Sequence, residues 1–412
     1  MSRFQRIVVV GGSLAGMNVI QELRRLGYLG AITLVGEEDV RSPYDRTELS
    51  KKLLTGTRDP DDLFLLTEEE IGELDLDLRL GRRATALSLD PSRHTLTLYN
   101  GAVLEFDALV VATGSRARRP AFMGDLAGVH VLRTLPDALA LRSELDSARD
   151  IVVVGAGFIG AEVAASVRTR GQSVTLVDPQ PTPLGTVLGP IVGSHFADLH
   201  TSHGTKLELG VGVQELAGDG RVTGVRLTDG RLLPADLVVV GVGGSPVTEW
   251  LDGSGVEVNN GVLCDDGGHT NVPGIYAVGD AARWYSDYFG AQVRSEHWNN
   301  ATLQATVVAE NIIAAEKKST LCAVPSFWSD QYRKRTQMVG CPRPTDEVCF
   351  VSGGPGDERF VALYGRDDRV TGVVSFNSPR GLIKYQHLVA EGASWSASTA
   401  ALENIISTDS GH

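Results

Sequence analysis

The chain has 412 residues, of which 42% are hydrophobic and 22% charged, and its formal net charge is −13. It is too long for one ordinary core, so about three domains are expected, and its acidic balance disfavours nucleic acid and anionic membranes as partners. No apolar run approaches the roughly 20 residues of a membrane-spanning helix, and glycines interrupt the N-terminal apolar run, so we expect no membrane span, no signal peptide and a cytoplasmic location.

The first predicted unit is a βαβ fold over Ile7–Glu37. The β-branched run Ile7–Val10 is typical of a buried strand, and apolar residues at helical spacing follow it as far as Gly27. Ile32–Val35 then gives a second buried strand. This order is that of a mononucleotide-binding half of a Rossmann fold.

The turn of this unit carries most of a dinucleotide fingerprint. Gly11 and Gly16 occupy the first and last glycine positions of GxGxxG, where backbone N–H groups at a helix N-terminus receive phosphate. Ser13 replaces the middle glycine and adds a hydroxyl where the pyrophosphate comes closest. Glu37, just after the second strand, is the acid expected at the ribose diol.

The segment Ser42–Leu54 is predicted to begin with a turn and to continue as a short helix. Thr47 or Ser50 is expected to cap that helix, which carries Lys51 and Lys52. On composition alone, an exposed basic helix with no further role is an equal alternative.

A second copy of the βαβ pattern runs over Ile151–Asp178. Here Gly155, Gly157 and Gly160 complete the GxGxxG, and Asp178 follows the second strand. A single turn of this kind also occurs without a ligand, but two in one chain, each closed by an acid, predict two dinucleotide sites.

Each βαβ unit is followed by the same arrangement. Residues 74–111 alternate short strands and turns as a β-meander and end in a small-residue turn at Val110–Gly114. Residues 206–241 repeat this plan, with a hairpin turn at Asp229–Gly230 and a strand that ends at Val239–Gly243. The two halves are therefore interpreted as two copies of one design.

The remaining chain completes an α/β protein with a third part. A short strand ends in Gly279 and Asp280, a helix is predicted over Asn299–Lys317, and strands and turns from about Ser319 predict an α+β domain. We predict two Rossmann-like dinucleotide-binding domains, the first at 1–115 with 236–318 and the second at 116–235, followed by a C-terminal α+β domain at 319–412.

Two dinucleotide sites in one chain indicate a fixed flavin and a nicotinamide that binds and leaves. The four cysteines form no CxxC or CxxxxC pair, and none precedes Cys264. This pattern excludes the dithiol relay of a disulfide reductase and is not typical of iron–sulfur binding. A flavin without a thiol relay passes its electrons directly to another acceptor.

Six motifs follow one another along essentially the whole chain: SPYDRTELSKKLL (42–54), VVATGS (110–115), GAGFIGAEVAA (155–165), TNVPGIYAVGD (270–280), RSEHWNNA (294–301) and SFWSDQY (326–332). With them the chain resembles the FAD-dependent, NADH-utilising ferredoxin reductases of the glutathione-reductase structural class. The resemblance implies that hydride passes from NADH to FAD and that electrons pass singly to a [2Fe-2S] ferredoxin serving a cytochrome P450 or a ring-hydroxylating dioxygenase. Three alternatives remain, namely a redox sensor like apoptosis-inducing factor, a reductase of rubredoxin or another acceptor, and a fold that has lost FAD through Ser13.

The resemblance also implies which residues hold FAD. These are Gly11, Ser13, Ala15, Gly16 and Glu37 at the adenosine and pyrophosphate, Arg46 and Lys51 at the pyrophosphate and flavin N5, Ala112, Thr113, Gly114, Gly279 and Asp280 along the middle, Glu296, His297 and Trp298 at the pyrimidine end, and Trp328 at the isoalloxazine. The alternative without the family is that Trp298 and Trp328 are core aromatics and that His297 is a buried histidine with its hydrogen bonds satisfied.

For NADH the resemblance implies Gly155, Gly157, Phe158, Ile159, Gly160, Glu162, Asp178 and Gly243. Glu162 is expected to face Lys51 where the nicotinamide stacks, and Lys51, Glu162 and Trp328 are the expected catalytic residues. An acid at Asp178 repels a 2′-phosphate, and PQPTPLG after it supplies no arginine to receive one, so NADH is predicted over NADPH. That segment also lacks the basic residue that such reductases often carry.

A basic surface is expected to dock the acidic ferredoxin, because charge complementarity steers such encounters. The candidates are Arg294 and the run Arg333, Lys334 and Arg335, which follows Trp328, and a solvated turn is the alternative. His195, His200 and His203 have a spacing loosely like that of a metal site. They lie on an amphipathic stretch, however, so no metal is predicted. We expect a monomer.

Overall fold

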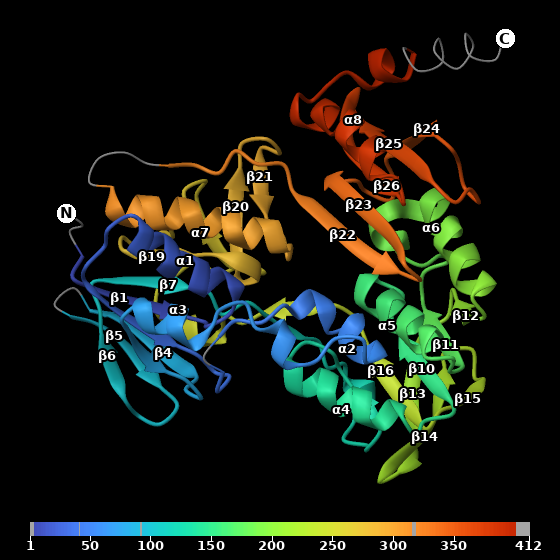
Figure 1. Ribbon diagram of the computed structural model, residues 1–412, viewed down its shortest axis with the longest axis horizontal. Helices are drawn as coiled ribbons and strands as arrows, with labels where there is room; N and C mark the ends of the chain where they lie inside the picture. The colour runs from blue at the N-terminus through green and yellow to red at the C-terminus, as the bar shows by residue number, and fades with distance from the viewer. Residues whose placement is uncertain (1–3, 41, 91–92, 315–318, 401–412) are drawn as a thin grey trace. The chain divides into compact units, whose positions relative to one another are not determined.

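The computed structural model describes residues 4–40, 42–90, 93–314 and 319–400, in which the chain forms two compact units (Figure 1). The first unit comprises Met1–Asp45, Leu63–Arg116 and Gly244–Pro325, and the second comprises Arg46–Asp62, Ala117–Gly243 and Ser326–His412. Among the described residues, none of the helices is both long and apolar enough to cross a bilayer.

The first unit is built on a five-stranded parallel sheet. Its order is β19 (Ile275–Ala277), β7 (Ala108–Val111), β1 (Arg6–Val10), β2 (Ala31–Val35) and β3 (Leu76–Arg79). The helix α1 (Leu14–Arg25) returns the chain from β1 to β2 and packs beside α7 (Trp298–Ile313) (Figure 1). Val10 pairs with Val35, so the turn after β1 lies beside the end of β2.

Smaller sheets complete the first unit. β4 (Ala84–Asp90), β5 (Arg93–Leu98) and β6 (Val103–Glu105) form an antiparallel meander, and β18 (Val262–Cys264), β20 (Ala282–Ser286) and β21 (Ala291–Val293) form a mixed sheet. β8 (Ser115–Ala117) pairs with β17 (Gly244–Pro246). The short helix α3 (Glu68–Glu73) begins with a capping box formed by Thr67 and Glu70.

The second unit contains a matching parallel sheet. Its order is β12 (Lys206–Leu209), β11 (Val174–Asp178), β10 (Ile151–Val154), β16 (Leu237–Val240) and β9 (Val129–His130). The helices are α2 (Lys52–Thr55), α4 (Leu135–Leu145), α5 (Phe158–Thr169) and α6 (Gly185–Ser202), the last kinked at Gly189. β13 (Val213–Asp219), β14 (Arg221–Leu227) and β15 (Leu232–Pro234) form an antiparallel sheet.

The C-terminal residues of the second unit form a five-stranded antiparallel sheet. Its order is β22 (Ser326–Gln331), β23 (Lys334–Gly340), β26 (Arg369–Phe376), β25 (Phe360–Arg366) and β24 (Glu347–Ser352), and α8 (Pro379–Ala390) packs on β26 and β23. Phe360, Tyr364 and Phe376 share one apolar core with Leu188 and Phe196 of α6. This core fixes the C-terminal sheet against α6.

The predicted fold class is confirmed, and some elements differ from their predictions. β3 was predicted in the meander, but it pairs with β2 in the parallel sheet. Leu237–Val240 pairs with β10 as β7 pairs with β1, so this strand belongs to the second parallel sheet. The helix predicted to reach Lys317 ends at Ile313, and residues 315–318, like 401–412 of the predicted third domain, lie outside the described residues. The predicted domain bounds stay a prediction.

Candidate active site

Two glycines shape the turn after β1. Gly11 has a φ of +119°, which disfavours any side chain, and a Cβ there would overlap the carbonyl oxygen of Ala112. A Cβ at Gly16 would likewise overlap the carbonyl oxygen of Gly11. Because neither has a side chain, α1 begins directly at the end of β1, where its N–H groups are suited to phosphate.

Ser13 is compatible with this turn. It is the N-cap residue of α1, with φ −97° and ψ −163°, and its hydroxyl makes no capping hydrogen bond. Gly157, its counterpart before α5, has a similar extended backbone, with φ −71° and ψ −177°. Since any residue adopts extended backbone, serine at this position introduces no strain.

The turn after β10 repeats the arrangement. Gly155 has a φ of +100°, and a Cβ at Gly155 or Gly160 would overlap a backbone carbonyl oxygen. Asp178, at the end of β11, accepts hydrogen bonds from the N–H of Ala156 at 2.6 Å and of Gln180 at 2.7 Å. Each carboxylate oxygen keeps a further lone pair for a ribose hydroxyl. The predicted acid therefore lies directly beside the predicted glycine turn.

The turns after β7 and β19 are neighbours because these strands pair in parallel. The hydroxyl of Thr113 donates to a backbone carbonyl at 2.6 Å, and that of Ser115 donates to the carboxylate of Asp280 at 3.1 Å. Gln304, buried on α7, accepts the N–H of Gly279 at 2.8 Å. Ser115 and Gln304 were not predicted as site residues, and they hold the predicted Asp280 and Gly279 in place.

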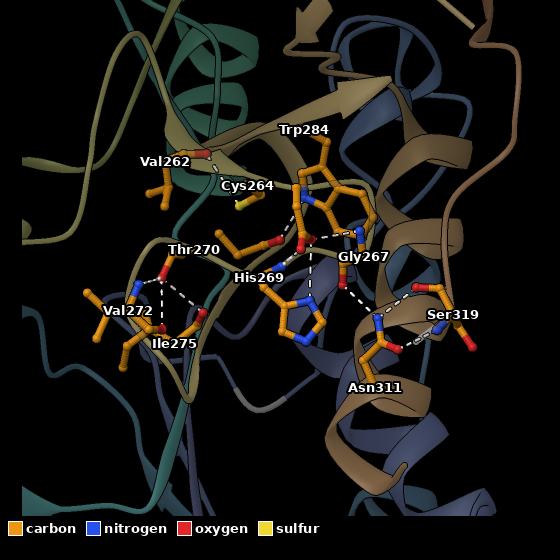
Figure 2. A network of polar contacts seen from close by, with 12 residues as sticks. Val262, Cys264, Gly267, His269, Thr270, Val272, Ile275, Trp284, Asn311 and Ser319 are labelled. Carbon is orange, nitrogen blue, oxygen red and sulfur yellow. Dashed lines mark hydrogen bonds and ion pairs between the residues drawn. The ribbon is translucent and has the colours of Figure 1, made fainter. Parts of the chain in front are cut away.

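A polar network supports the approach to this turn (Figure 2). The amide of Asn311 on α7 donates to the carbonyls of Gly267 at 2.9 Å and of Ser319 at 2.8 Å. The indole of Trp284 donates to the carbonyl of Ala277, the last residue of β19, at 2.9 Å. The loop before β19 and the strand itself are thereby fixed to α7 and β20.

The predicted pyrimidine-end residues lie at the start of α7, where His297 is the N-cap residue and Trp298 the first residue of the helix. The guanidinium of Arg294 pairs with Glu296 and donates to the carbonyl of Asp280 at 3.2 Å. Burial lowers the pKa of His297 to about 4, and the Asp280 carboxylate opposes this shift. The imidazole is therefore neutral at pH 7.

Lys51 and Glu162 form a buried ion pair within the second unit. Their Nζ and Oε2 atoms are 2.9 Å apart, and the side chains are 12% and 2% exposed. The hydroxyl of Ser50 donates to Oε2 at 2.5 Å, and that of Ser329 donates to Oε1 at 2.6 Å. Burial raises the pKa of the Glu162 carboxyl above its ordinary value, and Lys51 and both hydroxyls oppose this shift. A carboxylate with such opposing influences is typical of a functional site.

The predicted cap of the helix in Ser42–Leu54 is wrong. α2 begins at Lys52, its N-cap residue is Lys51, and no side chain caps it. The hydroxyl of Ser50 bonds to a carboxylate instead, and Thr47 offers its backbone carbonyl to Lys51 Nζ at 2.6 Å. The segment is therefore not merely an exposed basic helix, since only Lys52 of the two lysines is exposed.

The other predicted residues lie in helices, in strands and in the turns between them. Arg46 belongs to the second unit and donates to the carbonyl of Arg133 at 3.1 Å. The remaining ones are Ala15 in α1, Glu37 after β2, Ala112 and Gly114 after β7, Gly243 after β16, Phe158 and Ile159 at the start of α5, and Trp328 on β22.

Residues 5–305 match the family described as pyridine nucleotide-disulphide oxidoreductase, and residues 326–405 match the family described as reductase C-terminal. The chain belongs to the pyridine nucleotide-disulphide oxidoreductase family. Members of this family bind FAD and NAD(P)H.

Individual relatives cover nearly the whole chain. The 5,5'-dehydrodivanillate O-demethylase ferredoxin reductase subunit of Sphingobium sp. is 36% identical over 389 residues, which is 93% of each chain. Putidaredoxin reductase of Pseudomonas putida is 35% identical over 386 residues, 92% of this chain and 90% of its own. The reductase in the covalent putidaredoxin reductase–putidaredoxin complex has a TM-score of 0.90 and 32% identity, covering 99% of both chains.

Both glycine turns of this pyridine nucleotide-disulphide oxidoreductase fit their dinucleotides. Gly11 and Gly155 hold backbone conformations that leave the start of the following helix open to phosphate. A Cβ built at Gly157 meets nothing within 4 Å, so there is space for a close approach. These features are the cradle that the pyrophosphate of a dinucleotide requires.

The cysteines of this oxidoreductase are not arranged for disulphide chemistry, although the family name refers to it. All four are described and all are free. Burial raises the pKa of the Cys264 thiol, and it raises that of Cys341 to about 11, so both stay protonated at pH 7. Among the described residues, no three His, Cys, Asp or Glu side chains are grouped as metal ligands.

Proposed function

We propose that this protein takes hydride from NADH onto FAD and passes electrons singly to a [2Fe-2S] ferredoxin that serves a cytochrome P450 or a ring-hydroxylating oxygenase. FAD, when bound, accepts a hydride and releases electrons one at a time. The observation that carries the proposal is the combination of two glycine turns with a buried Lys51–Glu162 pair in a chain whose cysteines are all free.

The residues of the first unit bind and orient FAD in this proposal. N–H groups at the start of α1 bind the pyrophosphate, and Glu37 accepts the ribose hydroxyls. At the pyrimidine end, His297 is neutral and so has one ring N–H to donate and one ring nitrogen to accept. Asp280 is held by Ser115 and lines the middle of the cofactor.

The residues of the second unit bind the nicotinamide dinucleotide. The N–H groups at the start of α5 take its pyrophosphate, and Asp178 takes the adenosine ribose and disfavours a 2′-phosphate. Lys51 and Glu162 are proposed to position the nicotinamide. They are suited to this role because a buried ion pair held by two hydroxyls has little freedom to move. Trp328 is proposed to cover the isoalloxazine.

The ferredoxin partner is supported by the names of the relatives, one of which is a ferredoxin reductase subunit. The proposed docking surface is the turn between β22 and β23 together with the start of β23. Arg333 is exposed in the turn, and Arg335 on β23 is 54% exposed beside Asp330. Arg294 is left out, because its side chain is 14% exposed and paired with Glu296. A monomeric, cytoplasmic protein completes the proposal, and sedimentation velocity tests the monomer.

The test is anaerobic stopped-flow reduction by NADH or NADPH, followed by mixing with a [2Fe-2S] ferredoxin while flavin and cluster absorbance are recorded. We expect faster bleaching with NADH and rapid reoxidation by ferredoxin. Flavin that stays bleached beside ferredoxin contradicts the proposal. If another acceptor then reoxidises it, the other-acceptor alternative is favoured, and if no acceptor does, the sensor alternative is favoured.

The docking surface is tested separately with R333E/R335E, which reverses two charges of this surface. Electrostatic steering predicts slower ferredoxin-dependent reoxidation with a weaker salt dependence, while reduction by NADH is unchanged. R380E, an exposed reversal on α8, is the matched control and retains the wild-type salt dependence. Equal salt dependence in R333E/R335E and the wild type removes this surface from the proposal.

A further inference from the structure

A line of buried polar side chains leads away from Glu162 within the second unit, in which α5 and β22 are in contact (Figure 1). Ser329 Oγ donates to Glu162 Oε1 at 2.6 Å, and Gln331 Nε2 donates to Ser329 Oγ at 3.4 Å. Gln331 Oε1 lies 3.1 Å from Nε2 of His200 on α6. Ser329 and His200 are 0% exposed and Gln331 is 2% exposed, so water does not satisfy these groups.

The line continues to the turn between β22 and β23. The hydroxyl of Tyr332 is 2.9 Å from His200 Nδ1, and the hydroxyl of Thr205 is 2.9 Å from that of Tyr332. Tyr332 also stacks on His203, with ring centroids 3.9 Å apart, which holds its ring in place. Five hydrogen bonds thus connect Thr205 with the Glu162 carboxylate.

The direction of each hydrogen bond follows from the chemistry of the groups. Burial lowers the pKa of His200 to about 4, so at pH 7 the ring is neutral, with one nitrogen donating and one accepting. Gln331 Oε1 is an acceptor, hence His200 Nε2 carries the proton and Nδ1 accepts from Tyr332. Tyr332 has then donated its one proton, so it accepts from Thr205. Every donor in the chain points toward Glu162.

Aligned hydrogen bonds polarise one another, and they do so more strongly in a low-dielectric interior than in water. The Ser329 hydroxyl at the end of such a chain is therefore a better donor than an isolated serine. It meets the carboxylate oxygen that neither Lys51 nor Ser50 contacts, since these two approach Oε2. Without Ser329, Glu162 would be held from one side only.

We propose that Ser329 is a positioning residue for Glu162 and that the chain through Gln331, His200, Tyr332 and Thr205 holds its hydroxyl on the carboxylate. This arrangement favours the ionised form of Glu162 and holds the carboxylate in one orientation. That the orientation then serves the nicotinamide rests on the proposed function.

Other charges near Glu162 do not replace this contact. Within the described residues, Lys51 is the one charged group that pairs with its carboxylate. The remaining charged groups on the elements packed against α5 bond elsewhere: Lys52 to Glu48, Asp330 to Arg335, and Asp178 to backbone N–H groups. Around His200, the titratable neighbours are His203 and Tyr332.

The test is an infrared pH titration of the holoenzyme, in which subtraction of E162Q isolates the carboxylic-acid band of Glu162. A hydrogen bond to a charged group is strong enough that S329A is expected to raise the titration midpoint by about one to two pKa units. S329T, which keeps a hydroxyl, restores most of the wild-type midpoint. S375A removes another fully buried serine hydroxyl of the same sheet, bonded to a backbone carbonyl, and leaves the midpoint unchanged.

Y332F removes a donor remote from Glu162 and retains the ring, so it is expected to fold and to raise the midpoint in the same direction by less than one unit. Midpoints of S329A and Y332F equal to that of the wild type overturn the inference, whatever the rate of reduction by NADH. Raised midpoints with an unchanged pH profile of reduction by NADH retain the inference and overturn the assignment of Glu162 to the nicotinamide. The two proposals therefore fail separately.

Discussion

Replacing Lys51 with methionine removes the cation of the buried pair and keeps a flexible side chain of similar length. Glu162 is 2% exposed and retains Ser50 and Ser329 as donors, but it loses the ammonium 2.9 Å from Oε2. An unpaired buried carboxylate is strongly disfavoured, so it takes up a proton. K51M should therefore shift Glu162 further toward the neutral acid in the folded state.

The magnitude follows from the cost of that proton. The ordinary pKa of a glutamate is 4.5, so protonation at pH 7 costs at most about 3 kcal/mol, at about 1.4 kcal/mol for each pH unit. At pH 5 the same cost is about 0.7 kcal/mol. The folded state then binds a proton that the unfolded state has released, so the stability of K51M falls as pH rises above about 4.5.

Hydrogen exchange of the α5 amides measures this loss of stability locally. The quantity compared is the opening free energy of K51M minus that of the wild type, between pH 5 and pH 8. The difference should grow with pH until the folded carboxyl ionises. The corresponding difference between K51M/E162Q and E162Q should be independent of pH, because the amide of a glutamine does not titrate. A K51M deficit that is the same at pH 5 and pH 7, or a slope that survives in the double variant, refutes the reasoning.

Three further outcomes are expected. D178N weakens the acceptor beside the Gly155 turn and removes its charge. It should therefore lower the ratio of kcat/KM for NADH to kcat/KM for NADPH by about tenfold or more. An unchanged ratio contradicts the role of Asp178. S13G should change the FAD dissociation constant by less than about threefold, since the backbone at Ser13 is already extended, and loss of FAD would show that the hydroxyl binds it. Acidification from pH 6.5 to 4 should destabilise the second unit by up to about 3 kcal/mol through His200. The unfolded histidine binds a proton in this range, whereas the folded one, with a pKa of about 4, does not. Hydrogen exchange of the α5 and α6 amides in H200F should lack this acid-induced destabilisation.

The fold was predictable because its strongest signals are local. Ile7–Val10 and Ile151–Val154 are continuous β-branched runs, and each leads into a glycine whose positive φ no other residue adopts easily. Asp178 was also predictable, since the acid after the second strand necessarily comes beside the turn after the first when the strands pair in register. Such features depend on neighbours in the sequence and on one strand pairing.

The surroundings of Glu162 were not predictable in this way. Ser50 and Ser329 are 112 and 167 positions from Glu162, and their hydrogen bonds exist only because α5, β22 and the segment before α2 pack together. For Ser50 a local rule predicted a helix cap, and tertiary packing overrode it. Arg294 was predicted to belong to a basic docking surface, whereas its side chain is 14% exposed and pairs with Glu296. Charge alone does not tell which side of a loop faces solvent.

The SFWSDQ segment of β22 has an alternation of side chains that could have indicated the buried contacts of Ser329 and Gln331. Because side chains alternate along a strand, Phe327, Ser329 and Gln331 share one face and Trp328 lies on the other. The first face meets α5 and α6: Phe327 packs on Phe158, Ser329 bonds to Glu162, and Gln331 bonds to His200. Two buried polar residues at a spacing of two are unusual on an apolar face and indicate partners across it. The contacts of this face depend on the register of β22 with β23, because a one-residue slip would turn Ser329 and Gln331 away from α5 and α6.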